Sequence, residues 1–91
     1  MEIEVPNPSG LHARPAATFV KAANGFRCDV TLSNVTGRSD PANAKSIIAV
    51  LKLGVARGNT IRIEATGDDE DAAVESLRAL VATGIGESIG G

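Results

Sequence analysis

The segments of this chain that alternate between polar and apolar side chains are apolar on one side only. The clearest is residues 60–66, where two isoleucines and an alanine alternate with polar residues, and residues 2–5 and 28–33 follow the same period. This pattern is typical of strands that pack one face on a core and leave the other face in solvent. The chain is therefore predicted to form a sheet that is covered on one face only.

Between these segments, apolar residues recur at helical spacing. Residues 13–24 are expected to form a first helix, and residues 44–51 a short second helix with Asn43 as its N-cap. A third helix opens at residues 67–71, a glycine followed by four acidic residues, and a brief third strand must pass through the turn-rich residues 35–42. The buried stripe of the first helix is predicted at Ala16, Phe19, Val20 and Ala23. The order β-α-β-β-α-β-α with one-sided strands predicts an α/β (α+β) two-layer sandwich.

Length and composition limit the class of protein. The 91 residues suit one domain, expected over residues 1–83, with the glycine-rich residues 84–91 as a flexible tail or linker. A net charge of −2 and only two aromatic residues argue against binding to nucleic acid or to a membrane surface. The single cysteine, Cys28, excludes an internal disulfide framework and is expected to be buried. No apolar run is long enough to span a bilayer, so the protein is expected in the cytoplasm. It is also expected to be a monomer.

The only histidine lies in a stretch that suits phosphoryl chemistry. His12 follows a Ser-Gly turn, stands at or beside the expected N-cap of the first helix, and precedes Arg14 by two residues. Neutral imidazole is a nucleophile near pH 7, and the first amides of a helix bind anions. We expect His12 to accept a phosphoryl group and Arg14 to bind it, helped by Ser9 and by the amides of Ala13, Arg14 and Ala16. A histidine that only caps the helix or lies on the surface is the alternative. No metal or other cofactor is expected, since one histidine cannot build the usual metal site.

The sequence Gly10–Ala16 resembles the active-site motif of HPr, the histidine-containing phosphocarrier of the bacterial phosphoenolpyruvate:sugar phosphotransferase system. Residues 43–48, with Leu53 and Gly54 after them, resemble the second signature of that family. The resemblance implies an antiparallel sheet of strand order 1-4-2-3 with all three helices on one face. It also implies a carrier rather than an enzyme: His12 would receive a phosphoryl group at Nδ1 from Enzyme I and pass it to an Enzyme IIA-type domain.

The short second helix has more apolar side chains than it can bury, namely Ile47, Ile48 and Leu51. They either complete the core or form an exposed patch that docks partners, and the resemblance to HPr favours the patch. The rest of the partner-docking surface is expected at Ala17, Thr18, Lys21 and Gly54.

Ser46 is expected in the first turn of the same helix. In some HPr proteins the matching serine is phosphorylated by a regulatory kinase, so a serine kinase is a possible partner; a serine that only caps the helix is the alternative. Other functions also remain open. The chain could be a regulatory binding module that acts through Ser46 and the apolar patch, an interaction domain without chemistry, or the HPr domain of a multidomain phosphotransfer protein.

Overall fold

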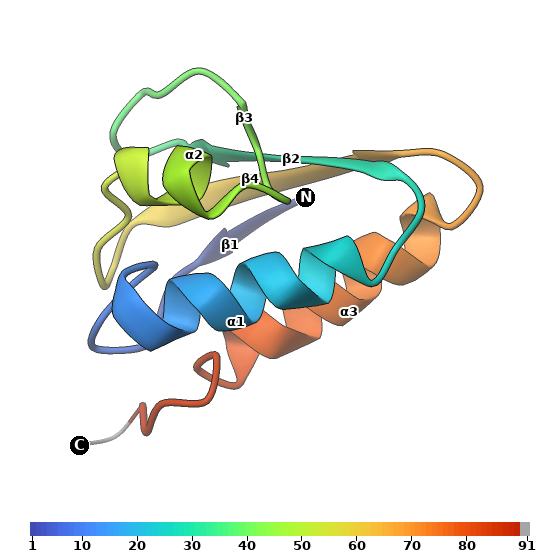
Figure 1. Ribbon diagram of the computed structural model, residues 1–91. Coiled ribbons are helices and arrows are strands. Elements are labelled where there is room, and N and C mark those ends of the chain that lie inside the picture. The colour runs from blue at the N-terminus through green and yellow to red at the C-terminus, as the bar shows by residue number, and fades with distance from the viewer. Residues whose placement is uncertain (90–91) are drawn as a thin grey trace.

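A single antiparallel sheet organises the chain. The structure, a computed structural model, describes residues 1–89. Its strands are β1 (Glu2–Glu4), β2 (Asp29–Asn34), β3 (Ala42–Asn43) and β4 (Thr60–Thr66). They pair in the order β1-β4-β2-β3, so the two central strands are β4 and β2 (Figure 1). This confirms the predicted strand order, and the third strand is only two residues long.

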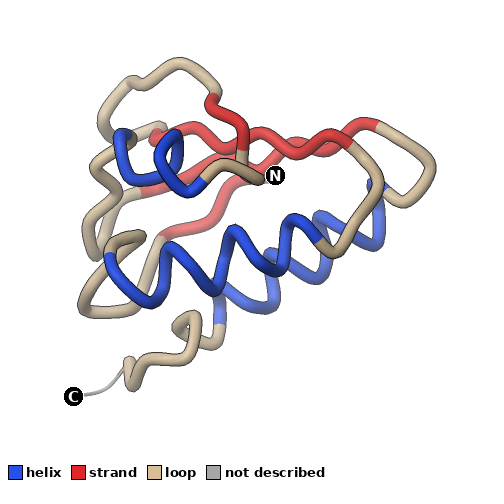
Figure 2. The backbone as a smooth tube through the Cα atoms, in the orientation of Figure 1, coloured by secondary structure: helices blue, strands red, loops and turns tan. Residues whose placement is uncertain are grey.

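Three helices cover one face of this sheet. They are α1 (Ala13–Asn24), α2 (Ile47–Lys52) and α3 (Glu70–Ala82). The α1 helix packs against both of the others, and Figure 2 shows α1 and α3 running alongside one another next to the strands. The buried side chains of all three helices and of the inward sheet face belong to one cluster. The helices therefore share one face, and the two-layer sandwich is confirmed.

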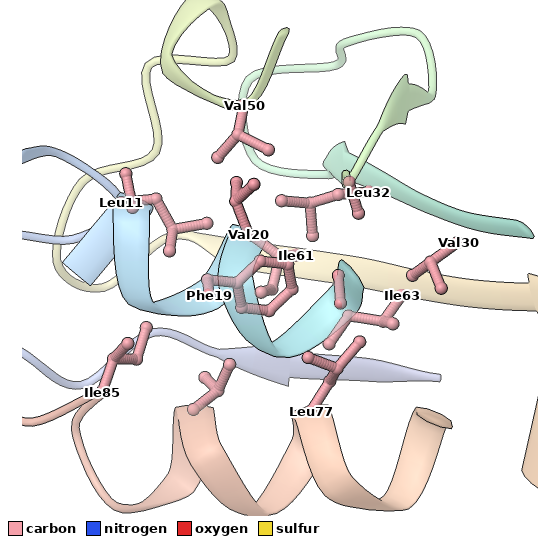
Figure 3. Close-up of a cluster of buried hydrophobic side chains, with 14 of the residues drawn as sticks. Leu11, Phe19, Val20, Val30, Leu32, Val50, Ile61, Ile63, Leu77 and Ile85 are labelled. Carbon is pink, nitrogen blue, oxygen red and sulfur yellow. The ribbon is translucent and has the colours of Figure 1, made fainter. Parts of the chain in front are cut away.

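The core lies between these two layers. All four residues of the stripe predicted for α1 are buried, and Figure 3 draws Phe19 among side chains from the sheet and from α3. Fully burying one such large apolar side chain stabilises the folded chain by about 1.5–3 kcal/mol. The strands contribute Val30, Leu32, Ile61 and Ile63, each at most 2% exposed. The alternation in the sequence thus identified the inward face correctly.

The start of α2 differs from the prediction. The helix begins at Ile47, with Ser46 as its N-cap, and the Ser46 Oγ accepts a hydrogen bond from the Ala49 amide at 3.3 Å. Asn43 belongs to β3 instead, and its Oδ1 accepts from the Lys45 amide at 3.0 Å. The prediction of Asn43 as the N-cap was wrong because this side chain closes the turn after β3.

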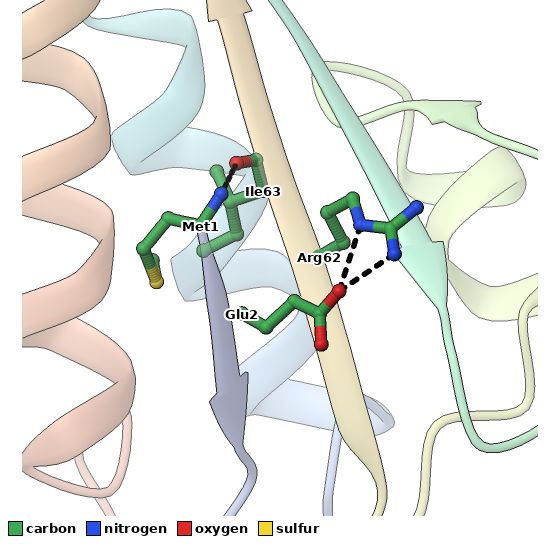
Figure 4. Close-up of polar contacts among 4 residues, drawn as sticks. All are labelled: Met1, Glu2, Arg62 and Ile63. Atoms are coloured by element: carbon green, nitrogen blue, oxygen red, sulfur yellow. Dashed lines mark hydrogen bonds and ion pairs between the residues drawn. The ribbon is translucent and has the colours of Figure 1, made fainter.

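The first strand pairs antiparallel with β4 at the edge of the sheet, and Figure 4 draws two polar contacts at its start. The Met1 amino group donates to the Ile63 carbonyl oxygen at 3.1 Å. Beside it, Arg62 donates from Nε and Nη2 to Glu2 Oε2, at 3.0 and 2.6 Å. This ion pair is nearly half exposed, so solvent screens it and its contribution to stability is small.

The packed part of the chain extends beyond the predicted boundary at residue 83. Ile85 is 1% exposed and joins the core, and the Glu87 carboxylate is hydrogen-bonded to Asn7 and Ser9. Contacts between the predicted tail and the rest of the chain therefore continue at least to Glu87. Residues 90–91 of that tail lie outside the described residues. Within residues 1–89, no helix combines the length and the apolar character needed to cross a membrane.

Asp69 ties the start of α3 to the segment that enters β2. Its carboxylate accepts from the backbone N–H of Arg27 at 2.8 Å and of Cys28 at 2.9 Å. The first of these bonds, followed by a bond with the Cys28 side chain, lowers the pKa of Asp69. Cys28 itself is buried, as predicted, and this burial together with the nearby Asp69 charge raises the pKa of its thiol. The cysteine is therefore a structural residue rather than a reactive one.

Replacing Asp69 by asparagine should weaken the fold in a pH-dependent way. Because the folded chain lowers the pKa of Asp69 below its ordinary value of 3.8, the ionised carboxylate stabilises the fold above about pH 5. That stabilisation is lost as the pH falls through the folded-state pKa. We expect the urea midpoint of Asp69→Asn to lie below that of the wild type at pH 7, and the gap to narrow near pH 3. Asp68→Asn, at an exposed neighbouring position, is the control. A gap that is independent of pH would contradict this prediction.

Candidate functional site

His12 is the N-cap of α1, as predicted. Its backbone is extended, with φ −124° and ψ 162°, and its side chain makes no capping hydrogen bond. The residue is exposed. The imidazole is therefore free to meet a reactant from outside the molecule. No pocket is found in the part of the chain that the structure describes, so the site is an open surface.

The turn before His12 is pressed against the loop that follows α2. The Leu11 amide donates to the Val55 carbonyl oxygen at 3.0 Å, and the Leu11 side chain is buried. Gly10 has φ +58°, and a Cβ at this position would lie 2.3 Å from the same Val55 oxygen. Only glycine fits both the left-handed backbone and this close approach. The Ser-Gly turn thus fixes the entry of the chain into α1.

Backbone strain lies directly after His12. Ala13, the first residue of α1, has φ 51°. For a residue with a Cβ, the left-handed conformation costs roughly 1–2 kcal/mol. Pro15 is buried in the first turn of the same helix, where its missing N–H breaks no helical hydrogen bond. The strained residue therefore sits between the candidate nucleophile and a regular helix.

The predicted phosphate-binding amides fall into two groups. The Ala16 N–H donates to the His12 carbonyl oxygen at 3.4 Å, so the prediction of a free amide at Ala16 was wrong. The N–H groups of Ala13 and Arg14 belong to the first turn and have no partner among the described residues. Arg14 is exposed, and its side chain makes no hydrogen bond within residues 1–89. These two amides and the guanidinium are available to an anion beside His12.

Ser9 does not have the free donors that phosphate binding needs. Its N–H donates to Glu87 Oε1 at 3.0 Å, and its Oγ donates to Glu87 Oε2 at 2.8 Å. Both Ser9 donors are therefore engaged with Glu87 here, and the role of Ser9 in binding phosphate stays a prediction. The sequence reasoning also missed Asn7, whose Nδ2 donates to Glu87 Oε1 at 2.9 Å. No local pattern could have indicated contacts between residues some 80 positions apart.

The predicted docking residues lie on α1, on α2 and, for Gly54, just after α2. Ile47, Ile48 and Leu51 are 38%, 64% and 39% exposed, so they form an apolar patch rather than part of the core. Of the other predicted residues, Ala17, Lys21 and Gly54 are exposed and Thr18 is half-buried.

Hydrogen bonds at both ends align this patch with His12. At the end of α1, Asn24 Nδ2 donates to the carbonyl oxygen of Lys45, just before α2. At the start of α1, the bond from Leu11 to Val55 joins the turn before His12 to the loop after α2. The two helices therefore run antiparallel, and the C-terminal end of α2 lies near His12. A partner that covers the patch would thus also approach the imidazole.

The comparisons with known proteins agree with this geometry. The family model described as "PTS HPr component phosphorylation site" matches residues 1–83. The phosphocarrier protein HPr of Haemophilus influenzae is 42% identical over 82 residues, which cover 90% of this chain and 93% of that protein. A crystal structure of HPr from Thermoanaerobacter tengcongensis superposes with a TM-score of 0.90 at 40% identity, covering 97% of this chain and 96% of that one.

A longer protein also contains a similar segment. The multiphosphoryl transfer protein of Haemophilus influenzae is 39% identical over 85 residues, which cover 93% of this chain but only 17% of that protein. The match therefore includes both a small protein of similar length and one part of a much larger protein. Because the family model covers most of the chain and the sheet has the expected strand order, this chain belongs to the HPr family of phosphocarriers of the phosphotransferase system.

Proposed function

We propose that this chain carries a phosphoryl group on His12, receiving it from phospho-Enzyme I and passing it to an Enzyme IIA-type domain. In this proposal the chain is a monomeric cytoplasmic carrier and not an enzyme with turnover of its own. The observation that carries the proposal is the exposed N-cap imidazole, which makes no capping bond and adjoins free first-turn amides. A nucleophile with an anion site beside it suits transient phosphorylation.

Transfer would proceed by attack of the His12 Nδ1 on the phosphorus of the donor phosphohistidine. A phosphorus–nitrogen bond forms on His12 as the corresponding bond on the donor breaks. In a second step the acceptor histidine attacks the same phosphorus, and its new bond forms as the bond to His12 breaks. Arg14 and the amides of Ala13 and Arg14 would stabilise the charge on the three phosphoryl oxygens. This reaction depends on positioning and electrostatics more than on covalent help from the protein.

The apolar patch would dock both partners. Ile47, Ile48 and Leu51 expose large side chains on a helix that lies beside α1. A carrier that must release each partner needs a small interface, below roughly 1,200 Å² in total. A few exposed aliphatic side chains, on a helix whose C-terminal end lies near His12, meet that need.

Replacing Ile48 by aspartate should weaken docking without unfolding the chain. Ile48 is 64% exposed, so the free energy of unfolding should change by no more than about 0.5 kcal/mol. Losing one central apolar contact costs about 1–2 kcal/mol of binding, so the apparent KM for this chain in transfer from phospho-Enzyme I should rise about tenfold. Ala72→Asp places the same charge at an exposed position of α3 and should leave the KM unchanged. An unchanged KM for Ile48→Asp would show that the patch does not dock Enzyme I.

Two further roles are part of the proposal. A serine kinase would phosphorylate Ser46 on the oxygen that caps α2. The phosphate would add negative charge beside the apolar patch, so docking would weaken.

The similarity to a segment of a multiphosphoryl transfer protein also favours a role as the HPr domain of a larger phosphotransfer protein. In either case the patch and His12 would act together.

The function is tested by incubating the chain with Enzyme I and labelled phosphoenolpyruvate. We expect label on the protein that is lost in acid and retained in base, as a phosphoimidazole would be. Label that resists acid would indicate a serine ester and contradict transfer through His12. A chain that takes up no label from a competent Enzyme I would contradict the carrier role altogether.

A further inference from the structure

The segment after α3 folds back towards the turn that precedes His12. Backbone hydrogen bonds join Ile85 to Leu80 and Glu87 to Gly84, and Ile85 is anchored in the core at 1% exposure. These contacts give the segment a defined path as far as Glu87. The carboxylate of that residue is then placed beside residues at the opposite end of the sequence.

Glu87 accepts three hydrogen bonds from this turn. Asn7 Nδ2 and the Ser9 N–H donate to Oε1, at 2.9 and 3.0 Å, and Ser9 Oγ donates to Oε2 at 2.8 Å. The bond from Asn7, followed by those from Ser9, lowers the pKa of Glu87 below its ordinary value. The carboxylate is therefore ionised at neutral pH, and all three bonds are charge-assisted.

Asn7 links this carboxylate to the turn at a cost. Its Nδ2 also donates to the Gly10 carbonyl oxygen at 2.9 Å, so both acceptors lie on the same side of the amide. The residue is fully buried, and its Oδ1 has no partner among the described residues. Leaving a buried acceptor unpaired costs about 1–3 kcal/mol, and flipping the amide would face its oxygen towards two other acceptors. In the fold, Asn7 Oδ1 is therefore left unpaired while both N–H groups of Nδ2 are hydrogen-bonded.

The turn is also held from the loop after α2. The Leu11 amide donates to the Val55 carbonyl oxygen, and Gly10 packs against the same loop. That loop is in turn joined to the segment after α3, because Arg57 Nη2 donates to the Ile89 carbonyl oxygen at 3.2 Å. Three segments that are distant in the sequence thus meet immediately before His12. His12 has no side-chain hydrogen bond of its own at the helix cap, and the strained Ala13 follows it. The direction of the imidazole therefore depends on how firmly the preceding turn is held.

We propose that Glu87 is a positioning residue for phosphoryl transfer: its carboxylate clamps the turn from Asn7 to Gly10 and so fixes His12 in the direction that faces a partner. This proposal rests on the carrier function proposed above. Glu87 acts through Asn7 and Ser9 rather than on the phosphoryl group. Without the clamp, His12 would sample more directions, and fewer encounters with a docked donor would be productive.

The test compares Glu87→Ala, Glu87→Gln and the control Ser88→Ala, an exposed neighbour. Transfer from phospho-Enzyme I is measured in a single turnover, well below the unfolding temperature of every variant. For Glu87→Ala we expect the rate at saturation to fall about tenfold with little change in KM, because the apolar patch is intact. Glu87→Gln should recover part of the rate, since its one remaining oxygen can still accept from Ser9. Ser88→Ala should match the wild type.

A spectroscopic measurement separates positioning from simple stabilisation. In Glu87→Ala, the amide signals of Ser9 and Gly10 and the ring signals of His12 should shift or broaden by NMR, whereas those of Ile47 and Ile48 should not. A wild-type rate for Glu87→Ala, with the wild type itself phosphorylated, would overturn the positioning role alone. A wild type that takes up no phosphoryl group would overturn the carrier function, and the positioning role with it.

Discussion

His12→Ala should take up no acid-labile label from phospho-Enzyme I. The side chain is the proposed nucleophile, and it is the one imidazole in the sequence. Removing a nucleophile that forms the covalent intermediate typically lowers the rate by about a thousandfold or more. The measurement is the amount of label bound to the protein after incubation with Enzyme I and labelled phosphoenolpyruvate.

The fold of this variant should remain intact. His12 is exposed and its side chain makes no capping hydrogen bond, so alanine removes no stabilising contact in α1. The free energy of unfolding should therefore change by no more than about 0.5 kcal/mol. Label that persists on a folded His12→Ala protein would show that another residue is phosphorylated. If that label also resists acid, Ser46 is the residue to examine.

The parts of the fold that depend on local periodicity were predictable from the sequence. The helix expected over residues 13–24 has those bounds, and the strand expected over residues 60–66 is β4. In both, many residues contribute to one period, so a single exception changes little. The strand order came from the resemblance to HPr, because alternation alone does not say which strands are neighbours.

Errors arose where one or two residues decide the outcome. Asn43 and Ser46 are both good N-caps, three residues apart, and only the pairing of β3 with β2 shows that Asn43 is already in a strand. The error at Ala16 was avoidable. Once His12 is the N-cap, Ala16 lies four residues later, where its N–H reaches the first carbonyl oxygen of the helix.

The clamp at Glu87 was beyond sequence reasoning. A glycine-rich stretch after a helix is typical of a mobile tail. Glu87 is the one charged residue in that stretch, and nothing beside it in the sequence indicates which residues it would bind. Its donors are Asn7 and Ser9, at the other end of the sequence. The candidate site therefore combines a proposed nucleophile, which a short motif indicates, with a proposed support that only the tertiary structure brings together.

Gly10→Ala should damage both stability and transfer. Two separate costs combine at this position. The left-handed backbone, with φ +58°, costs roughly 1–2 kcal/mol for a residue with a Cβ. The new Cβ would also lie 2.3 Å from the Val55 carbonyl oxygen and 2.9 Å from the Ala56 Cα, so the backbone must move. Overpacking of this kind typically costs a further 1–3 kcal/mol, a large share of the stability of a small domain.

Gly58→Ala is the matched control for this prediction. Its φ is +88°, but a Cβ there would meet nothing within 4 Å, so it carries the backbone cost without the clash. In urea unfolding, Gly10→Ala should lose about 1–3 kcal/mol more stability than Gly58→Ala. At a temperature where both proteins remain folded, transfer from phospho-Enzyme I should be slow only for Gly10→Ala. The displaced backbone carries the Leu11 amide away from Val55, and His12 moves with it. Equal losses of stability and rate in the two variants would mean that the close approach of the turn to the loop after α2 does not position His12.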